Sequence, residues 1–286
     1  MSNVAQQLQA ARESLAPISG ELAGLEARLL AQHAWGVTPE VIVRDHDCTV
    51  CAEKIQALEI LVARRLTREP LAQIVGYKHF WKDDFAVTRD VLTPRADSET
   101  LIEACLRHRV TAEHILDLGT GSGCLLLSLL REYPQARGVG VDTSPAALNV
   151  ARRNAHNTLR ANRCEFLGGY WCGPLELGQR FDLVVANPPY IPTREISKLM
   201  RDVRDHEPRM ALDGGADGLD DYRAILHSIT PHLKPRALLL FEVGAGQAHD
   251  VAMHAQAHGF TTVEIAKDIQ GIDRVVVLTK TPGEAL

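Results

Sequence analysis

The chain alternates short apolar runs with helical patterns from residue 114 onward, and this alternation constrains the fold more than any other feature. Helical patterns occupy 124–131 and the stretch after Ser144-Pro145, where a serine N-cap precedes a proline at the first helical position. Such an order predicts an α/β fold with a mostly parallel sheet and helices on both faces. The seven predicted strands are 114–118, 138–141, 163–167, 182–186, 237–243, 261–265 and 274–278.

A glycine-rich loop follows the first predicted strand, as Gly119-Thr120-Gly121-Ser122-Gly123. Its glycines permit positive φ and allow a ligand to approach the backbone closely. The dinucleotide fingerprint would require glycine where this chain has Cys124, and the loop lacks the lysine of a phosphate-binding loop. Asp142 ends the second strand, where an acidic side chain accepts hydrogen bonds from ribose hydroxyls. A nucleoside without pyrophosphate fits this pattern, and S-adenosyl-L-methionine is the predicted cofactor.

Asn187-Pro188-Pro189-Tyr190 follows the strand 182–186, at the edge where open α/β sheets bind their ligands. The two prolines carry no backbone N–H, so the backbone here presents mainly carbonyl acceptors. Asn187 adds a side-chain carbonyl, and Tyr190 adds an aromatic face. The stretch therefore favours an NH2 group on a conjugated plane: a carboxamide, or the exocyclic amino group of adenine or cytosine.

The N-terminal third has a different texture from the rest of the chain. Residues 4–72 carry helical spacing of leucines, and Thr38-Pro39 is typical of a helix start. Between residues 76 and 95 the pattern predicts a β-hairpin with an acidic turn at Asp83-Asp84. We expect three parts: a helical domain at 1–75, a hairpin linker at 76–95, and a catalytic domain at 96–286.

Composition indicates which partners the protein can bind and in which cellular compartment it works. Thirty-one basic and 36 acidic residues give a net charge of −5, which argues against a surface that tracks nucleic acid. No apolar run approaches the ~20 residues of a membrane span, so no membrane partner is expected. The six cysteines and the absence of a signal-like N-terminus predict reduced thiols in a cytoplasmic protein. Cys48 and Cys51 form a lone C-x-x-C pair without a second pair, so no metal is predicted.

Taken together, these motifs resemble the HemK/PrmC family of S-adenosylmethionine-dependent methyltransferases, which modify a glutamine of peptide chain release factors. The resemblance runs through most of the chain, and Ala96, Tyr170 and His206 depart from the family pattern. The stretches that carry it are 68–70, Gly76 with Phe80, 92–95, 119–123, Asp142, 187–190, 207–209, 211–215 and 273–276.

The resemblance implies a class I methyltransferase fold, with an N-terminal helical domain that helps to engage the release factor. It implies cofactor contacts from Gly119, Thr120, Gly121, Ser122, Gly123, Asp142, Trp171 and Asn187. Spacing alone would assign Trp171 to the core. The glutamine site would be Asn187, Pro188, Pro189 and Tyr190, with Asn187, Pro188 and Tyr190 catalytic. The predicted activity is methyl transfer to the side-chain amide nitrogen of the glutamine in a Gly-Gly-Gln motif, which releases S-adenosyl-L-homocysteine and tunes translation termination. We expect a monomer.

Three alternatives stay open at this point. One is methylation of a ribosomal-protein glutamine, against which only the family pattern of the N-terminal half argues. Another is methylation of an exocyclic amino group in nucleic acid, which the acidic balance and the lack of a basic segment interleaved with aromatic residues disfavour. The third is a binding protein without catalytic activity. Such a protein would not need a pocket made only of hydrogen-bond acceptors.

Overall fold

The structure, a computed structural model, describes residues 2–108 and 111–280 and divides into two compact units. A helical unit comprises the chain up to Tyr77 together with Met200–His206. An α/β unit comprises Lys78–Leu199 and the chain from Glu207 onward. The segment 200–206, which follows the Asn-Pro-Pro-Tyr stretch in sequence, thus belongs to the helical unit.

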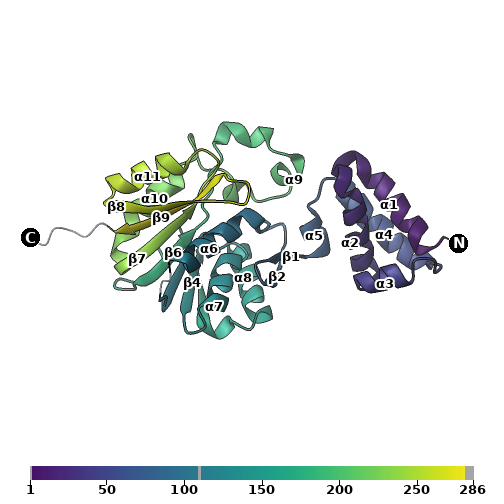
Figure 1. Cartoon of the computed structure of the whole chain (residues 1–286), viewed down its shortest axis with the longest axis horizontal. Coiled ribbons are helices and arrows are strands. Elements are labelled where there is room, and N and C mark those ends of the chain that lie inside the picture. The colour runs from purple at the N-terminus through teal and green to yellow at the C-terminus, as the bar shows by residue number, and fades with distance from the viewer. Residues whose placement is uncertain (1, 109–110, 281–286) are drawn as a thin grey trace, which may run out of the picture. The chain divides into compact units, whose positions relative to one another are not determined.

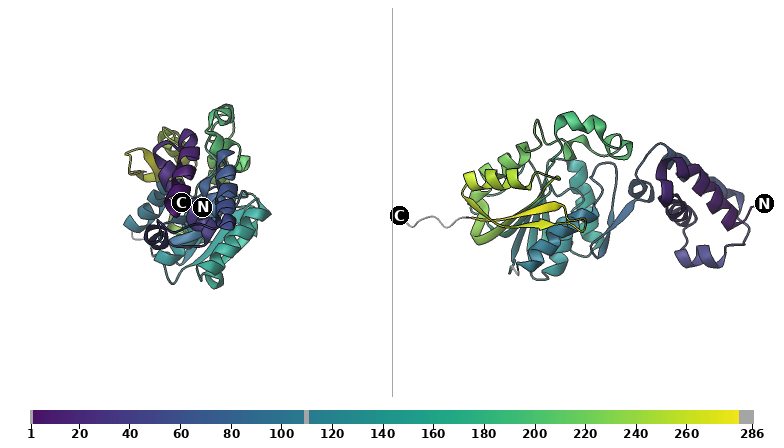
Figure 2. Two further views of the ribbon diagram at one scale, coloured as in Figure 1. Left: turned by 90° about the vertical axis from the view of Figure 1, so that its right-hand side faces the viewer. Right: turned by 45° about the horizontal axis from the view of Figure 1, so that its top comes forward.

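Local sequence signals mark the starts of two helices in the helical unit, whose N-terminal helices, purple in Figure 2, form a bundle. Asn3 and Gln6 form a capping box at the first helix, and Thr38 with Pro39 opens the third. Leucines and isoleucines of several helices, such as Leu15, Leu30 and Leu58, pack into one buried cluster. The helices are α1 (Val4–Ser19), α2 (Ala23–Trp35), α3 (Pro39–Arg44), α4 (Ala52–Leu66), α5 (Leu71–Val75) and α9 (Arg201–Arg204).

A buried arginine holds α9 in the helical unit. The Arg65 side chain is 7% exposed, and its Nε donates to Glu26 Oε2 at 2.9 Å while its Nη1 donates to Asp202 Oδ2 at 2.8 Å. Because a buried charge is costly without a partner, these ion pairs bring together α2, α4 and α9, which lie far apart in sequence.

The hairpin consists of β1 (Tyr77–Phe80) and β2 (Asp83–Ala86), and its predicted acidic turn is wrong. The turn is Trp81-Lys82, with Trp81 at φ 56°, and both aspartates lie in β2. Asp83 is held in the strand by Arg131 at 2.7 Å and Arg160 at 3.1 Å. These arginines come from distant parts of the chain, so the local sequence gave no sign of the pairing.

All seven predicted strands of the main sheet are confirmed, with ends that differ by a few residues. They lie in the order β5-β4-β3-β6-β7-β9-β8, and β9 runs antiparallel to both its neighbours while the other pairings are parallel. The strands are β3 (His114–Leu118), β4 (Arg137–Asp142), β5 (Cys164–Gly168), β6 (Phe181–Ala186), β7 (Leu233–Glu242), β8 (Phe260–Lys267) and β9 (Asp273–Lys280).

Helices cover both faces of this sheet, as Figure 1 shows. Alternate residues of each strand point to opposite faces, so Leu239 and Phe241 of β7 join one buried cluster while Leu238 and Leu240 join the other. The first cluster packs against α10 (Asp220–Ser228) and α11 (Ala248–Ala257). The second packs against α6 (Glu99–Arg107), α7 (Cys124–Glu132) and α8 (Pro145–Asn157).

Of the helices in the described part of the chain, none has both the length and the apolar character that crossing a bilayer requires.

Candidate functional site

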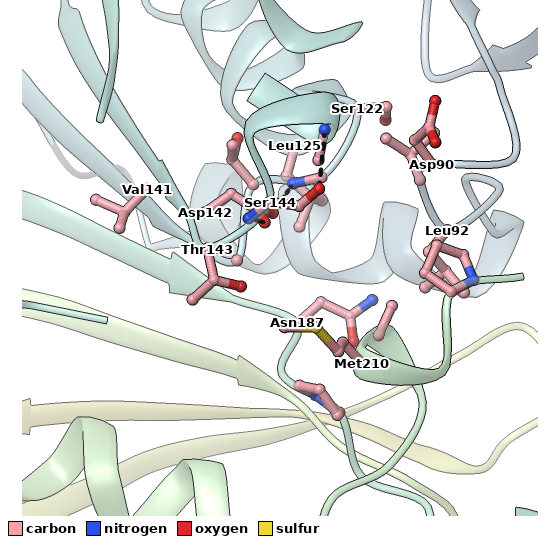
Figure 3. A pocket seen from close by; sticks show the side chains of 18 of the residues that line it. Asp90, Leu92, Ser122, Leu125, Val141, Asp142, Thr143, Ser144, Asn187 and Met210 are labelled. Atoms are coloured by element: carbon pink, nitrogen blue, oxygen red, sulfur yellow. Dashed lines mark hydrogen bonds between the residues drawn. The ribbon is translucent and has the colours of Figure 1, made fainter. Parts of the chain in front are cut away.

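A pocket of about 440 Å³ opens at the carboxyl ends of β3, β4 and β6. Its volume is in the range of small-molecule sites, and its place is where open α/β sheets bind ligands. In Figure 3, Asp142 and Ser144 lie together near Ser122, and Asn187 and Met210 lie below them. One cavity therefore joins the predicted cofactor loop to the predicted amide site.

Most of the predicted site residues line this pocket. They are Gly119, Thr120, Gly121, Ser122, Asp142, Trp171, Asn187 and Pro189. Gly123, Pro188 and Tyr190 lie next to lining residues in sequence and are not in the lining.

The glycine loop is held in a tight turn by the strands around it. The backbone N–H groups of Gly119 and Thr120 both donate to the carbonyl of Val141 at 2.9 Å. Gly119 has φ 74°, and a Cβ built there would lie 3.2 Å from the Trp171 ring. Because glycine has no Cβ, Trp171 and the loop can lie close together at the pocket wall.

Asp142 braces the same loop and keeps acceptor capacity for a ligand. Its Oδ2 accepts from the Gly121 N–H at 2.9 Å, and its Oδ1 accepts from the Ser144 N–H at 2.9 Å. A carboxylate has about four acceptor positions, so two protein donors leave room for ribose hydroxyls. The donor set and the glycine loop fit a nucleoside cofactor of the predicted kind.

Trp171 is anchored by a carboxylate, Asp221, which no sequence motif marks as part of the site. Its indole Nε1 donates to Asp221 Oδ1 at 3.2 Å, and the Tyr170 hydroxyl donates to the same oxygen at 2.9 Å. Asp221, from α10, lines the pocket, and its burial raises the pKa of its carboxyl. Tyr170, a departure from the family pattern, thus shares the anchor of the tryptophan beside it.

Replacing this anchor should weaken the cofactor site. Asp221→Ala removes an acceptor that two side chains share, and the loss should cost about 1–2 kcal/mol of cofactor binding free energy. We therefore expect S-adenosylmethionine to bind roughly 5–30-fold more weakly. Calorimetric titration measures this directly. Asp220→Ala is the matched control, because the Asp220 side chain is 60% exposed and pairs with Arg223. Equal affinities of the two variants would contradict the anchoring role.

Two segments far apart in sequence form another wall of the pocket, at 92–95 and 208–211. Arg95 Nη2 lies 2.6 Å from Glu207 Oε2, and the Glu207 side chain is 1% exposed. Burial raises the pKa of Glu207, and the positive charge of Arg95 opposes that rise. The ion pair fixes the start of the second segment, which brings Met210 to the pocket.

Asn187 is half-buried at the end of β6, and its Nδ2 lies 3.4 Å from Ser98 Oγ, so the amide N–H side faces the protein. The Asn187 Oδ1 remains as the acceptor for a ligand. Among the described residues no hydrogen bond reaches the Pro188 carbonyl, whereas the Tyr190 carbonyl accepts from Gln247 Nε2 at 2.9 Å. The Tyr190 carbonyl is therefore already engaged within the protein, and the Pro188 carbonyl is the one open to a ligand.

The Tyr190 ring is partly buried against the cluster on the α10 and α11 face, and a Cβ on Gly244 would lie 2.9 Å from it. That packing occupies part of the aromatic surface. Burial also raises the pKa of the Tyr190 hydroxyl, which keeps the phenol protonated.

Cys124 lines the pocket at the start of α7, but it is not a nucleophile. Burial raises the pKa of its thiol to about 12, and the thiolate is the reactive form.

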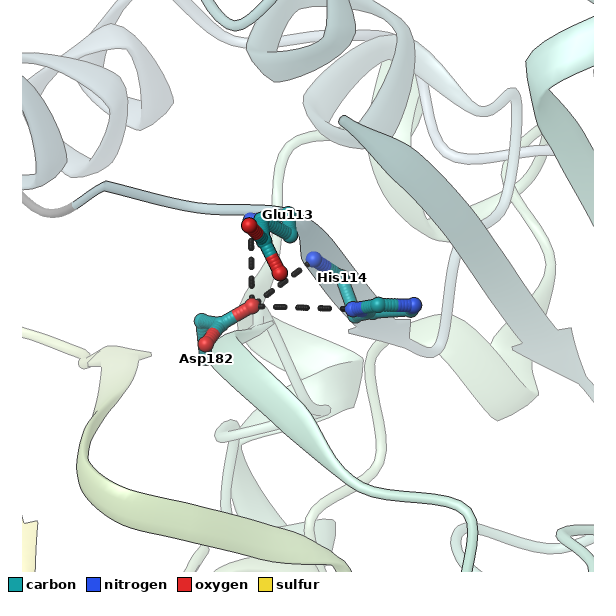
Figure 4. A group of neighbouring side chains, drawn as sticks. All are labelled: Glu113, His114 and Asp182. Carbon is teal, nitrogen blue, oxygen red and sulfur yellow. Dashed lines mark hydrogen bonds and ion pairs between the residues drawn. The ribbon is translucent and has the colours of Figure 1, made fainter. Parts of the chain in front are cut away.

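A cluster of possible metal ligands, Glu113, His114 and Asp182, lies at the opposite edge of the sheet (Figure 4). Lys234 Nζ lies 3.0 Å from Asp182 Oδ2 and 2.9 Å from His114 Nδ1, so an ammonium group already supplies the positive charge there. Asp182 also accepts from the backbone N–H groups of residues 113 and 114. The group joins the starts of three strands, so these side chains have a structural role there.

Comparison with known proteins gives the family. The model of the PrmC N-terminal domain matches residues 6–76, and that of a methyltransferase domain matches residues 115–206. The chain is 45% identical to the release factor glutamine methyltransferase of Rhodospirillum rubrum, over 88% of this chain and 77% of that protein. It is 43% identical to the enzyme of the same name from Caulobacter vibrioides, over 96% of each chain.

Among solved structures, a methyltransferase from Pyrococcus furiosus aligns with a TM-score of 0.52 at 15% identity, covering 69% of this chain and 89% of that one. This likeness shows the class I S-adenosylmethionine-dependent methyltransferase fold. With identities of 43–45% along most of its length, the chain belongs to the family of release factor glutamine methyltransferases.

Proposed function

We propose that this protein transfers a methyl group from S-adenosylmethionine to the side-chain amide nitrogen of the glutamine in the Gly-Gly-Gln motif of peptide chain release factors. The observation that carries the proposal is a single pocket lined by the 119–122 loop, Asp142 and Asn187. The names of the relatives supply the substrate class. By this reaction the protein would tune translation termination.

The cofactor half of the pocket binds and orients the methyl donor. The chemistry that S-adenosylmethionine supplies when bound is an electrophilic methyl group on a sulfonium centre. Asp142 would accept the ribose hydroxyls, the 119–123 loop would lie along the nucleoside, and Trp171 would pack on it. We propose no metal for this reaction.

The acceptor half aims a weak nucleophile. An amide lone pair is delocalised into its carbonyl, so the nitrogen must be positioned and its developing positive charge stabilised. Asn187 Oδ1 and the Pro188 carbonyl would each accept one N–H of the glutamine, and both dipoles would favour that charge. Holding the nitrogen in line with the methyl group can lower the barrier by up to ~7–11 kcal/mol in favourable cases. Pro189 and Tyr190 complete the site, and no general base is needed before transfer.

These contacts are too few to bind glutamine tightly, because two hydrogen bonds supply only ~0.5–1.5 kcal/mol each. Affinity must come from a larger protein surface, which we assign to the helical domain, 1–75, with the hairpin 76–95. We therefore expect no measurable methylation of free glutamine under conditions where a release factor is modified. Turnover of free glutamine at a rate comparable to that of a release factor would contradict this division of roles.

We further propose that the protein works as a cytoplasmic monomer. All six cysteines are free thiols, as expected in a reducing compartment. Its acidic balance fits a protein substrate better than a nucleic acid.

A substrate panel tests the proposal. The protein is incubated with radiolabelled S-adenosylmethionine and, separately, with a release factor, a ribosomal protein fraction and DNA. Label is expected on the release factor, and it should disappear when the glutamine of its Gly-Gly-Gln motif is replaced. Label on the ribosomal proteins or DNA alone would overturn the proposal.

A further inference from the structure

Glu242 is a buried carboxylate with no assigned role at the carboxyl end of β7. It is 2% exposed, and its Oε2 has no hydrogen-bond partner among the described residues. The strand before it is wholly apolar from Ala237 to Phe241, so the packing of β7 gives no reason for a carboxylate. A buried polar atom without a partner is rare in folded proteins and calls for an explanation.

Strand register places this carboxylate beside Asn187. Ala186 of β6 is paired with Phe241 of the parallel strand β7, so Asn187 and Glu242 are the next pair along. Side chains alternate along a strand, so Asn187 lies on the same face as Val185, and Glu242 on the same face as Leu240. Val185 and Leu240 both belong to the cluster that packs against α6. The polar side chains of Ser98 and Asn187 lower the pKa of the Glu242 carboxyl, and Asn187 Nδ2 lies 3.4 Å from Ser98 Oγ.

The surroundings of Glu242 combine the positive charge of Arg274 with burial and the negative charge of Asp97, and the last two resist ionisation of the carboxyl. Burial raises the pKa of Glu242 to about 7, although Arg274 opposes the rise. Asp97, which precedes α6, raises it further. Tyr190, Tyr222 of α10 and Cys124 of α7 also face it, and the charge of Glu242 raises the pKa of each of them. Glu242 therefore changes charge near neutral pH.

We propose that Glu242 is a positioning residue for methyl transfer: together with Ser98 it accepts the Asn187 Nδ2 group and thereby turns Asn187 Oδ1 toward the glutamine amide. An asparagine side chain can present either its oxygen or its NH2 after a half-turn, and only the oxygen can accept from an amide N–H. Two acceptors behind Asn187 select the orientation that the reaction requires. Glu242 is absent from the pocket lining, so it acts through Asn187. The inference rests on the proposed function.

The test is Glu242→Gln in the full-length protein, assayed with a release factor. Because a glutamine can donate to Asn187 Oδ1 and reverse the asparagine, we expect kcat to fall about tenfold to a hundredfold, with the KM for S-adenosylmethionine unchanged. The wild-type rate should rise with pH through about 7, as Glu242 ionises and becomes the stronger acceptor, and the variant should lose that rise. Ser98→Ala should lower kcat in the same direction.

Thermal stability separates positioning from a structural role. A carboxyl with a raised folded-state pKa binds a proton in the folded protein that the unfolded chain has lost, so stability falls as pH rises from its ordinary value of 4.5 to about 7. Because Glu242→Gln cannot ionise, it avoids this loss of stability. At pH values above 7 its Tm should therefore exceed that of the wild type, although its kcat is lower. Ser128→Ala is the matched control for Ser98→Ala, since Ser128 is also buried, lies on α7 and is absent from the pocket lining. This variant should leave kcat unchanged.

The outcomes are distinct. A wild-type protein that transfers no methyl group to a release factor overturns the proposed function, and the inference with it. A wild-type protein that is active, beside Glu242→Gln and Ser98→Ala variants with unchanged kcat and pH profile, overturns the inference alone. Loss of kcat with an unchanged KM for S-adenosylmethionine and a raised Tm supports it.

Discussion

Asn187→Ala is expected to lower the rate of methyl transfer to a release factor by about 10²–10³-fold while weakening S-adenosylmethionine binding only mildly. The substitution removes the side-chain acceptor that Asn187 contributes to the amide site, and with it the dipole that stabilises charge on the attacking nitrogen. Cofactor contacts from the glycine loop, Asp142 and Trp171 remain, so most of the binding free energy for the methyl donor is kept. Calorimetry beside a single-turnover assay measures the two effects separately.

Asn149→Ala is the matched control, because Asn149 is an exposed residue on α8 whose side chain bonds only to Arg152 among the described residues. It should retain wild-type activity and cofactor affinity. If Asn187→Ala lost cofactor affinity as severely as it lost rate, Asn187 would be chiefly a cofactor residue.

Gly214→Ala is expected to reduce activity by up to about 10²-fold by moving the backbone of the amide site. A Cβ at this position would lie 2.5 Å from the Pro189 carbonyl oxygen and 2.9 Å from the Tyr190 Cα. Backbone atoms cannot swing aside as the end of a flexible side chain can, so the 189–190 peptide must shift. Because Gly214 does not require positive φ, the effect would come from this contact.

The control for this prediction is Gly24→Ala, on α2. A Cβ there meets only the Arg12 side chain at 3.7 Å, an ordinary contact, and alanine favours a helix over glycine. Activity of both variants is measured at saturating S-adenosylmethionine, with the Tm of each recorded. A folded Gly214→Ala protein with full activity would show that the exact position of Pro189 and Tyr190 is unimportant.

The sheet could be predicted from the sequence because its information is local. Buried parallel strands are continuous apolar runs, and starts such as Ser144-Pro145 carry their own caps. The glycine loop and Asp142 were likewise recognisable, since the turn after the first strand of such a fold binds the nucleoside ligand.

What the sequence could not supply depends on pairs that are distant along the chain. Asp83 lies in a strand because Arg131 and Arg160 hold it, and α9 belongs to the helical unit because Asp202 meets Arg65, 137 positions earlier. Asp221 and Ser98 look like ordinary polar residues of helix starts. No local pattern marks them as parts of a site.

Glu242 is an intermediate case. A single carboxylate follows the apolar run 237–241 at the end of β7, at the same edge of the sheet where Asp142 ends β4 and Asn187 follows β6. That position was a usable signal, because an acidic residue in a buried run needs a reason. Its relation to Asn187 required the register of β6 and β7, which only the structure supplies.

The central claim is that Asn187 and its neighbours direct a methyl group to a glutamine side-chain nitrogen. Tandem mass spectrometry of a release factor treated with the protein and S-adenosylmethionine tests it most directly. The predicted result is one added methyl group on the side-chain nitrogen of the glutamine in the Gly-Gly-Gln motif, formed about 10²–10³-fold more slowly when Asn187→Ala replaces the wild type. A methyl group on any other residue, or the same modification by Asn187→Ala at the wild-type rate, would contradict it.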